Sequence, residues 1–207
     1  MSDARTISVY ERSVADYVAL TPGTGGAPFE AFVARLPGGG RVLDWGCGPG
    51  HFAARLASRG LVVDAVDATP AMVAHAVAEH AVAARVATFA ELDAVGAYDG
   101  IWASFSLLHA ARDDVPGRLE AAWTALRPGG VLYLSVKVGE GERRDALGRR
   151  YTYFGEAELA ALLGAAGFAI EATFGGVSRG LSGAEERWTG LLSARDGRGR
   201  SASEENA

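Results

Sequence analysis

One short segment, residues 42–53 with the sequence VLDWGCGPGHFA, constrains the fold of this chain more than any other. It leads from an apolar pair into three glycines at alternate positions, Gly46, Gly48 and Gly50, and then into apolar residues spaced as on one helix face. A strand, a glycine turn and a helix in this order place backbone amides of the helix N-terminus at the carboxyl edge of a parallel sheet. Glycine lets a ligand approach the backbone and tolerates positive φ. The segment therefore predicts an α/β fold with a nucleotide-like ligand at the turn.

The glycine spacing and one acid narrow the kind of nucleotide. The dinucleotide-binding fingerprint places its third glycine three positions after the second, whereas Gly48 and Gly50 lie two apart. Asp44, two residues before Gly46, adds a carboxylate that repels a pyrophosphate and attracts a cation. The segment resembles the S-adenosylmethionine-binding motif of class I methyltransferases, which consists of an apolar pair, an acid, any residue and three glycines at alternate positions.

This resemblance extends over about residues 8–194 and implies a fold class. The fold implied is α/β, Rossmann-like and doubly wound, with a seven-stranded, mostly parallel sheet, an antiparallel last strand and N-terminal cap helices. The middle and end of the chain look most like small bacterial methyltransferases related to the tellurite-resistance type. We expect a single domain over residues 1–194, with cap helices in 1–40 and the Rossmann-like core in 41–194. Residues 195–207 are polar and lack apolar periodicity, which predicts a disordered tail.

Hydrophobic periodicity and turn residues predict the individual elements. The stretch after Lys137 carries mixed charges and is expected to be a solvated loop. Helices are expected over residues 8–20 and 29–36, from the glycine turn to residue 58 or 59, from residue 70 onward, after residue 114 and over 156–166, and strands over 61–66, 85–89, 101–103, 131–138, 168–174 and 187–194.

The resemblance implies S-adenosylmethionine as the cofactor and S-adenosylhomocysteine as the product. Asp67 lies 21 positions after Gly46, where an acid at the end of the second strand accepts hydrogen bonds from both ribose hydroxyls. The third strand lacks the acid that many family members place behind it, so Phe89 and nearby backbone amides are expected to contact the adenine. The residues expected to contact the cofactor are Asp44, Gly46, Cys47, Gly48, Asp67, Ala68, Met72, Phe89, Ala90, Glu91, Ser104 and Tyr10.

The residues that follow the fourth strand leave the same carboxyl edge as the glycine turn and, in the resembled family, line the methyl-transfer pocket. His109 is a candidate catalytic general base if the acceptor must lose a proton. A packed, hydrogen-bonded histidine is the other interpretation. Tyr10 and Tyr17 are candidate lid residues, and ordinary packing on one helix face is the alternative.

The acceptor is expected near the charged stretch, which also leaves a carboxyl edge of the sheet, where ligands collect in open α/β folds. Taken one residue at a time, these charges are adequately explained by a solvated loop. The substrate candidates are Tyr17, Ser106, Lys137, Arg143, Arg149 and Tyr151, which would hold a small molecule, an anionic one included.

Composition limits the classes of function. With 207 residues, 49% of them hydrophobic, the chain suits one domain with a full core. A net charge of -5 argues against a general nucleic-acid binder. The single cysteine and four histidines form no disulfide and no metal pattern, so no metal is expected. No apolar run approaches the roughly 20 residues of a membrane span and no secretory pattern is present, so a cytoplasmic protein without membrane contact is expected. A monomer or a homodimer is expected.

The expected function is transfer of a methyl group from S-adenosylmethionine to a small-molecule acceptor by in-line displacement. Two alternatives remain: a non-catalytic S-adenosylmethionine-binding module, and a dinucleotide-dependent oxidoreductase, against which the glycine spacing and Asp44 argue. The acceptor atom, whether oxygen, nitrogen, sulfur or a metalloid, stays open.

Overall fold

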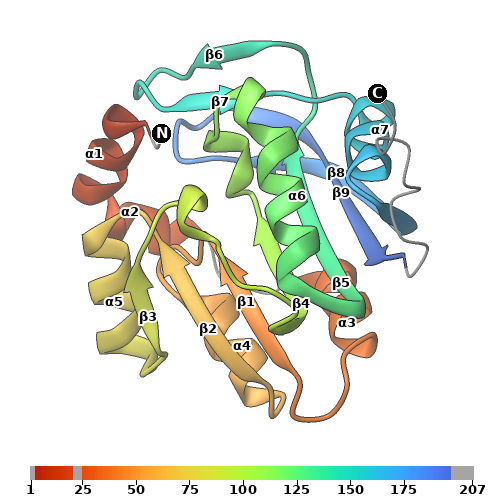
Figure 1. The fold of residues 1–207 in the computed structure, drawn as a ribbon. Helices are drawn as coiled ribbons and strands as arrows, with labels where there is room; N and C mark the ends of the chain where they lie inside the picture. The colour runs from red at the N-terminus through yellow and green to blue at the C-terminus, as the bar shows by residue number, and fades with distance from the viewer. Residues whose placement is uncertain (1–2, 21–24, 197–207) are drawn as a thin grey trace.

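The computed structural model describes residues 3–20 and 25–196. Its centre is a seven-stranded sheet with the strand order β3-β2-β1-β4-β5-β9-β8 (Figure 1). The strands are β1 Arg41–Trp45, β2 Val62–Asp67, β3 Ala84–Val86, β4 Tyr98–Ser104, β5 Leu126–Lys137, β8 Phe168–Arg179 and β9 Glu185–Arg195, and a separate hairpin consists of β6 Glu142–Arg144 and β7 Arg150–Thr152. The helices are α1 Ala4–Arg12, α2 Val14–Leu20, α3 Gly26–Ala34, α4 His51–Ser58, α5 Pro70–His80, α6 Val115–Ala125 and α7 Glu156–Ala165, with 3-10 turns at Phe89–Glu91, Leu107–His109 and Arg112–Asp114.

The strands β1 to β5 are parallel, and β9 runs antiparallel to both β5 and β8. From β1 the chain first builds outward through β2 and β3, and then returns to the other side of β1 with β4. Ligands of open α/β sheets bind in the crevice outside the carboxyl ends of the strands where the order reverses, here between β1 and β4. The predicted fold class, with its antiparallel last strand and N-terminal helices, is confirmed.

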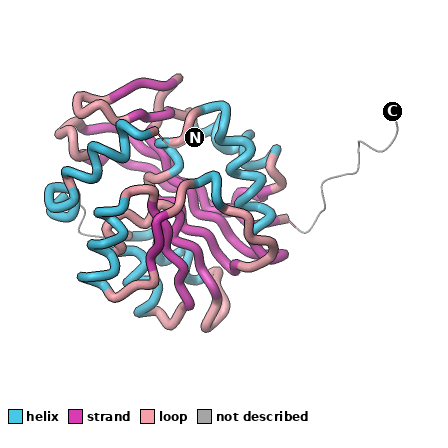
Figure 2. The backbone as a smooth tube through the Cα atoms, turned by 60° about the vertical axis from the view of Figure 1, so that its left-hand side comes forward, coloured by secondary structure: helices cyan, strands magenta, loops and turns pink. Residues whose placement is uncertain are grey.

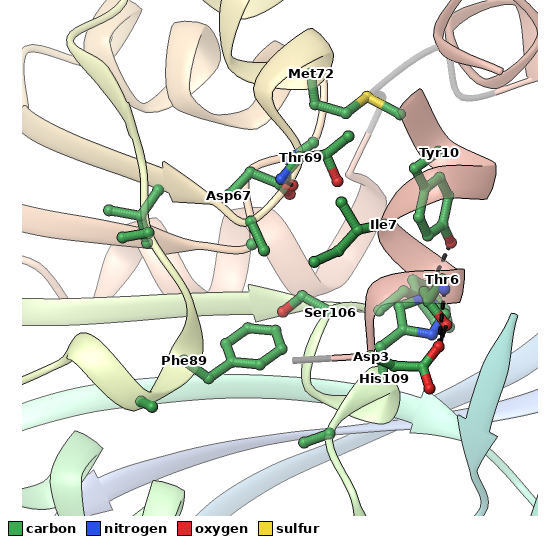
Figure 3. A pocket seen from close by; sticks show the side chains of 18 of the residues that line it. Asp3, Thr6, Ile7, Tyr10, Asp67, Thr69, Met72, Phe89, Ser106 and His109 are labelled. Atoms are coloured by element: carbon green, nitrogen blue, oxygen red, sulfur yellow. Dashed lines mark hydrogen bonds between the residues drawn. The ribbon is translucent and has the colours of Figure 1, made fainter. Parts of the chain in front are cut away.

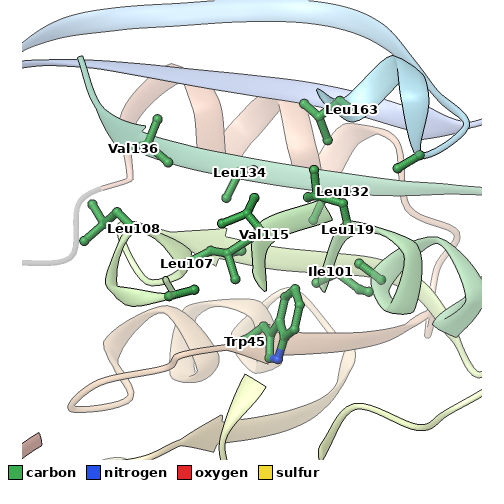
Figure 4. Packing of buried hydrophobic residues seen from close by; sticks show 14 of the residues in the cluster. Trp45, Ile101, Leu107, Leu108, Val115, Leu119, Leu132, Leu134, Val136 and Leu163 are labelled. Atoms are coloured by element: carbon green, nitrogen blue, oxygen red, sulfur yellow. The ribbon is translucent and has the colours of Figure 1, made fainter. Parts of the chain in front are cut away.

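Helices cover both faces of the sheet, as Figure 2 shows. On one face, Phe29 and Phe32 of α3 and Leu56 of α4 pack with buried residues of β1, β4 and β5. On the other, Leu119 of α6 and Leu163 of α7 pack against β5 (Figure 4). Because both faces are covered, the central strands are almost continuously apolar, and the site is confined to the carboxyl edge of the sheet.

The N-terminal segment differs from the single helix predicted over residues 8–20. Asp3 caps α1, since its carboxylate accepts a hydrogen bond from the amide of Thr6 (2.8 Å), so the helix begins earlier than predicted. At Ser13 the backbone leaves the helical region (φ -123°, ψ 20°) and a second helix follows. The break brings the rings of Tyr10 and Tyr17 edge to face, with centroids 5.5 Å apart. Helix α3 likewise begins at Gly26, before the predicted start.

The charged stretch after Lys137 forms a hairpin where a loop was expected, although all three residues of β6 are exposed as predicted. Strands β6 and β7 pair antiparallel beside α1. Asp3 pairs with Arg144 (2.7 Å), and the amide of Arg150 donates a hydrogen bond to the hydroxyl of Thr6 (2.8 Å). The polar groups of this stretch therefore meet α1 rather than water alone, which makes α1 and the hairpin one structural unit above the carboxyl edge.

Several boundaries also moved. Strand β3 ends at Val86, before the predicted residue 89, and β5 begins at Leu126, before the predicted residue 131. Strand β8 continues to Arg179, beyond the predicted residue 174, and β9 begins at Glu185, before the predicted residue 187. Of the predicted tail, residue 195 belongs to β9, and residues 197–207 lie outside the described residues. Within the described ranges no helix is both long enough and apolar enough to cross a membrane.

Candidate functional site

The glycine turn after β1 is held from two sides. The amide of Gly46 donates a hydrogen bond to the carbonyl of Val66 at the end of β2 (2.8 Å). Gly46 has φ +85°, and a Cβ on it would lie 2.3 Å from the Cβ of Ser106. At Gly48 (φ +53°) a Cβ would instead point toward the ring of Tyr17, 3.7 Å away. The turn is therefore closed toward the sheet and opens toward α2.

Asp67 joins the end of β2 to this turn. One carboxylate oxygen accepts a hydrogen bond from the amide of Gly48 (3.0 Å), and the other accepts one from the amide of Thr69 (2.8 Å). Burial raises the pKa of Asp67, and these two amides act against that rise. The side chain faces a hollow together with Thr69 and Met72, as Figure 3 shows.

Asp44 is the unusual group of the site. Its side chain is almost completely buried, with 2% of the residue exposed, and within the described part of the chain its Oδ2 has no hydrogen-bond partner. Burial, followed by the nearby charge of Asp67, raises the pKa of Asp44 to about 8, although a backbone hydrogen bond from Ala53 lowers it. A buried carboxylate with a free oxygen beside a cavity matches a ligand that brings a positive charge.

The first hollow lies between α1, the glycine turn, the end of β2 and Phe89, and spans about 910 Å³ with its mouth (Figure 3). Ile7 and Tyr10 face it from α1, and Phe89 and Ser106 lie opposite Asp67. Many of the residues predicted to contact the cofactor line this hollow: Tyr10, Gly46, Gly48, Asp67, Ala68, Met72, Phe89, Ala90 and Ser104.

A second hollow, about 1620 Å³ with its mouth, adjoins the first and shares Tyr10, Tyr17, Gly46, Gly48, Ser104 and Phe105 with it. The backbone of Phe105 is left-handed (φ 51°), a strained conformation for a bulky side chain, where the chain turns away from β4. Beyond the shared residues, its lining includes Asp44, Cys47, Trp102, Tyr133, Lys137, Arg149, Tyr151 and Trp188.

Tyr10 is fixed at the junction of the two hollows. His109 Nδ1 lies 2.6 Å from the carbonyl oxygen of Arg150, so Nδ1 carries the proton and Nε2 accepts a hydrogen bond from the Tyr10 hydroxyl (2.9 Å). Arg149 Nη1 donates to the same hydroxyl (2.9 Å). Burial lowers the pKa of His109 to about 4. His109 is thus a neutral link between α1 and the hairpin with both nitrogens engaged, and its role as a general base stays a prediction.

The lining of the second hollow also includes two buried cations, each paired with its own carboxylate. Lys137 is paired with Glu186, and its Nζ lies 3.8 Å from the centre of the Tyr151 ring. The side chain of Arg149 is 1% exposed and its Nη2 donates to Asp145 (2.6 Å). The structure therefore brings together three of the predicted acceptor residues, Lys137, Arg149 and Tyr151.

Four other candidates lie apart from the cavity or are engaged elsewhere. The Glu91 carboxylate accepts hydrogen bonds from the amide and hydroxyl of Thr88 (both 2.8 Å) at an exposed turn. Arg143 is 60% exposed and stacks over Tyr153. The Ser106 hydroxyl donates to the carbonyl oxygen of Trp45 (2.5 Å), and the thiol of Cys47 donates to the carbonyl of Gly48 (3.6 Å). Roles for these four toward cofactor or acceptor stay predictions.

Sequence reasoning missed the aromatic side chains of the second hollow, Trp102, Phe105, Tyr133 and Trp188. Apolar periodicity assigns them to the core of strands or to loops, and only the position of Trp102, beside Asp44 on the neighbouring strand, carries a usable signal. Among the described residues, no group of three or more His, Cys, Asp or Glu side chains is arranged to hold a metal ion.

Comparison with known proteins gives one family match and many structural neighbours. Residues 42–130 match the family model described as a methyltransferase domain. The chain is similar to 1,6-didemethyltoxoflavin-N1-methyltransferase from Burkholderia thailandensis, solved with 1,6-didemethyltoxoflavin and S-adenosylhomocysteine, with 28% identity and a TM-score of 0.75 over 93% of this chain and 88% of that one. No curated protein matches the sequence significantly.

Two more distant neighbours share the fold. Phosphoethanolamine N-methyltransferase 2 from Haemonchus contortus, solved with S-adenosyl-L-methionine, is 16% identical with a TM-score of 0.70 over 90% of this chain and 57% of that one. The [4+2]-cyclase SpnF is 18% identical with a TM-score of 0.68 over 93% of both chains.

The match to the methyltransferase-domain model covers residues 42–130, which contain the glycine turn, Asp44 and Asp67. The sheet around these residues has the fold of the neighbours that were solved with S-adenosylhomocysteine or S-adenosyl-L-methionine. The similarity to the tellurite-resistance type stays a prediction.

Proposed function

We propose that this protein binds S-adenosylmethionine across the junction of the two hollows and transfers its methyl group to a small-molecule acceptor. The observation that carries the proposal is the buried carboxylate of Asp44, whose Oδ2 has no partner in the described chain, beside a glycine turn that opens toward the cavity. A neutral ligand, or one with a pyrophosphate, would leave that carboxylate uncompensated or repelled.

Each part of the cofactor has a matching group. Asp67, at the end of β2, accepts the ribose hydroxyls, while Phe89, Ala90 and Met72 provide an apolar surface for the adenine. Asp44 takes the positively charged amino group. When bound, S-adenosylmethionine supplies a methyl group on a positively charged sulfur, open to in-line displacement by the acceptor.

The acceptor occupies the second hollow, against Lys137, Arg149 and Tyr151. The chain's contribution to the reaction is mainly to hold the acceptor in line with the methyl group, since good alignment alone lowers the barrier by roughly 7–11 kcal/mol. His109 positions Tyr10 through the Nε2 hydrogen bond. A small-molecule acceptor is also supported by the Burkholderia neighbour, which was solved with 1,6-didemethyltoxoflavin.

The test is a screen of small acceptors, anionic and neutral, for formation of S-adenosylhomocysteine by the purified protein. We expect turnover with at least one acceptor, and a raised KM for it in Lys137→Ala, Arg149→Ala and Tyr151→Ala. If all three variants keep full activity and acceptor affinity, the assignment of the acceptor to this wall is wrong.

One observation favours a second candidate, a module that binds S-adenosylmethionine without transferring its methyl group. Both nitrogens of His109, the histidine that the sequence singles out as a base, are engaged in hydrogen bonds within the chain. Binding of S-adenosylmethionine with no turnover across the whole acceptor panel would favour this second candidate.

A further inference from the structure

Trp102 and Asp44 are neighbours on parallel strands. They are register partners in the pairing of β1 with β4, and register partners point their side chains to the same face of a sheet. Both residues are buried, with 2% of Asp44 and 1% of Trp102 exposed. Two polar side chains thus lie side by side on one face of the sheet, close to the carboxyl ends of their strands.

Each of the two carries a polar atom without a hydrogen-bond partner in the described chain, Oδ2 of Asp44 and Nε1 of Trp102. This is not a general feature of the tryptophans, since Trp123 Nε1 donates to the carbonyl oxygen of Gly167 (3.1 Å). Buried polar atoms in native proteins are nearly always paired, so an adjacent free acceptor and free donor call for a common explanation.

The indole of Trp102 is held in a fixed orientation. It stacks on Tyr133 with centroids 4.2 Å apart and an interplanar angle of 18°. Phe32 and Phe52 pack against it at 5.2 and 5.1 Å. Because the ring cannot turn its N–H toward another acceptor, the free donor is a built feature of the site.

Both residues line the second hollow next to the glycine turn. A free carboxylate oxygen matches an ammonium group, and a free N–H matches a carboxylate oxygen. An α-amino acid carries these two groups on one carbon atom. The adjacent acceptor and donor therefore match the zwitterionic end of an amino acid, rather than a sugar or a phosphate.

We propose that Trp102 binds the carboxylate of the cofactor's amino-acid end through its indole N–H, while the neighbouring Asp44 binds the ammonium group. This assignment rests on the proposed function, because it names a binding residue for the same cofactor. Both atoms are shielded from water in the structure, and both residues line the second hollow. A ligand without an amino-acid group forms no hydrogen bond with Asp44 or Trp102, so these two residues do not strengthen its binding.

The test compares two probes by calorimetry, S-adenosylhomocysteine and 5′-methylthioadenosine, which keeps the adenosine and the thioether but lacks the amino-acid group. The variant is Trp102→Phe, and Trp123→Phe is the matched control on α6, away from both hollows. We expect Trp102→Phe to weaken S-adenosylhomocysteine binding about tenfold or more, in keeping with a lost hydrogen bond to a charged group. Binding of 5′-methylthioadenosine should be unchanged, and the control should bind both probes as the wild type does.

The outcomes separate this assignment from the proposed function. If Trp102→Phe weakens both probes equally, or neither, Trp102 does not recognise the amino-acid end, and a structural role or a bridging water explains its N–H. If the wild type binds neither probe, the proposed function itself fails, and the assignment fails with it.

A second measurement does not depend on how well the variant folds. Of the four tryptophan indole N–H resonances, the one missing from Trp102→Phe should move downfield when S-adenosylhomocysteine is added to the wild type, as a new hydrogen bond forms. It should stay in place with 5′-methylthioadenosine. Equal shifts with both probes would overturn the proposal.

Discussion

The two halves of the cavity differ in whether their buried polar groups have partners within the chain. Around the glycine turn, Asp44 Oδ2 and Trp102 Nε1 are buried without partners in the described chain. On the opposite wall, Lys137 is paired with Glu186 and Arg149 with Asp145. The first half is incomplete without a ligand, whereas the second is complete by itself. We infer that the first half recognises one fixed ligand, and that the second holds its shape and admits an acceptor by fit.

A substitution in the glycine turn should have the largest effect on both stability and binding of S-adenosylhomocysteine. In Gly46→Ala the new Cβ would meet Ser106 at 2.3 Å and would also carry the strain of φ +85°. We expect a loss of about 3 kcal/mol or more in the free energy of unfolding, measured by chemical denaturation, together with loss of S-adenosylhomocysteine binding.

Gly129→Ala is the matched control, because Gly129 has a similar φ of +77° and no atom within 4 Å of the position of a Cβ. It should lose only about 1 kcal/mol. Equal losses in the two variants would show that the turn does not need its close contact with Ser106.

Removing the charge of Asp44 should move stability and binding in opposite directions. The pKa of Asp44 lies near 8 in the folded protein against an ordinary 3.8, so between these values the folded state holds a proton that the unfolded state has lost. The contribution of Asp44 to stability therefore falls as the pH rises from about 4 to 8, and it is most unfavourable above pH 8.

In Asp44→Asn the side chain cannot ionise, so the loss of stability that Asp44 causes as the pH rises should disappear. The variant without ligand should be more stable than the wild type by about 1–3 kcal/mol at pH 8, with a smaller gain at pH 5. Its affinity for S-adenosylhomocysteine should fall about 10- to 100-fold, as expected for loss of a charged hydrogen bond. Denaturation at both pH values and calorimetry measure the two effects, and a variant that is less stable at pH 8 would contradict them.

A change in the opposite wall should leave the first half untouched. Lys137→Met should raise the KM for an acceptor about tenfold and change the affinity for S-adenosylhomocysteine by less than about twofold, because Lys137 is paired with Glu186 and lies over the Tyr151 ring rather than at the glycine turn. A loss of S-adenosylhomocysteine affinity as large as that of Asp44→Asn would show that the two halves are not separable. Arg143→Ala, with its exposed guanidinium, should have the smallest effect on either quantity.

The same contrast explains how much could be predicted from the sequence. Asp44, Gly46 and Gly48 belong to one contiguous strand and turn, and Asp67 follows at the end of the next strand, so local geometry fixes their places. The wall around Lys137 depends instead on Glu186, 49 residues away, and on Tyr10, which reaches Arg149 across 139 residues. The spacing of apolar residues along the sequence does not predict such long-range side-chain pairs.

Two features of the secondary structure differ from the sequence prediction for a related reason. The break at Ser13 serves the contact between Tyr10 and Tyr17, and the hairpin after Lys137 pairs with α1 through Asp3. Each is set by tertiary contacts that local patterns do not contain. Trp102 was assigned to the strand core because apolar patterns cannot distinguish a satisfied indole N–H from a free one.

Calorimetry of the wild-type protein with S-adenosylmethionine and with NADH distinguishes a site for the methyl donor from a site for a dinucleotide. Asp44 Oδ2, which has no partner among the described residues, and the two-residue spacing of the glycines predict binding of S-adenosylmethionine with micromolar or tighter affinity and no binding of NADH. Binding of NADH without binding of S-adenosylmethionine would show that the glycine turn holds a dinucleotide and that the proposed function is wrong.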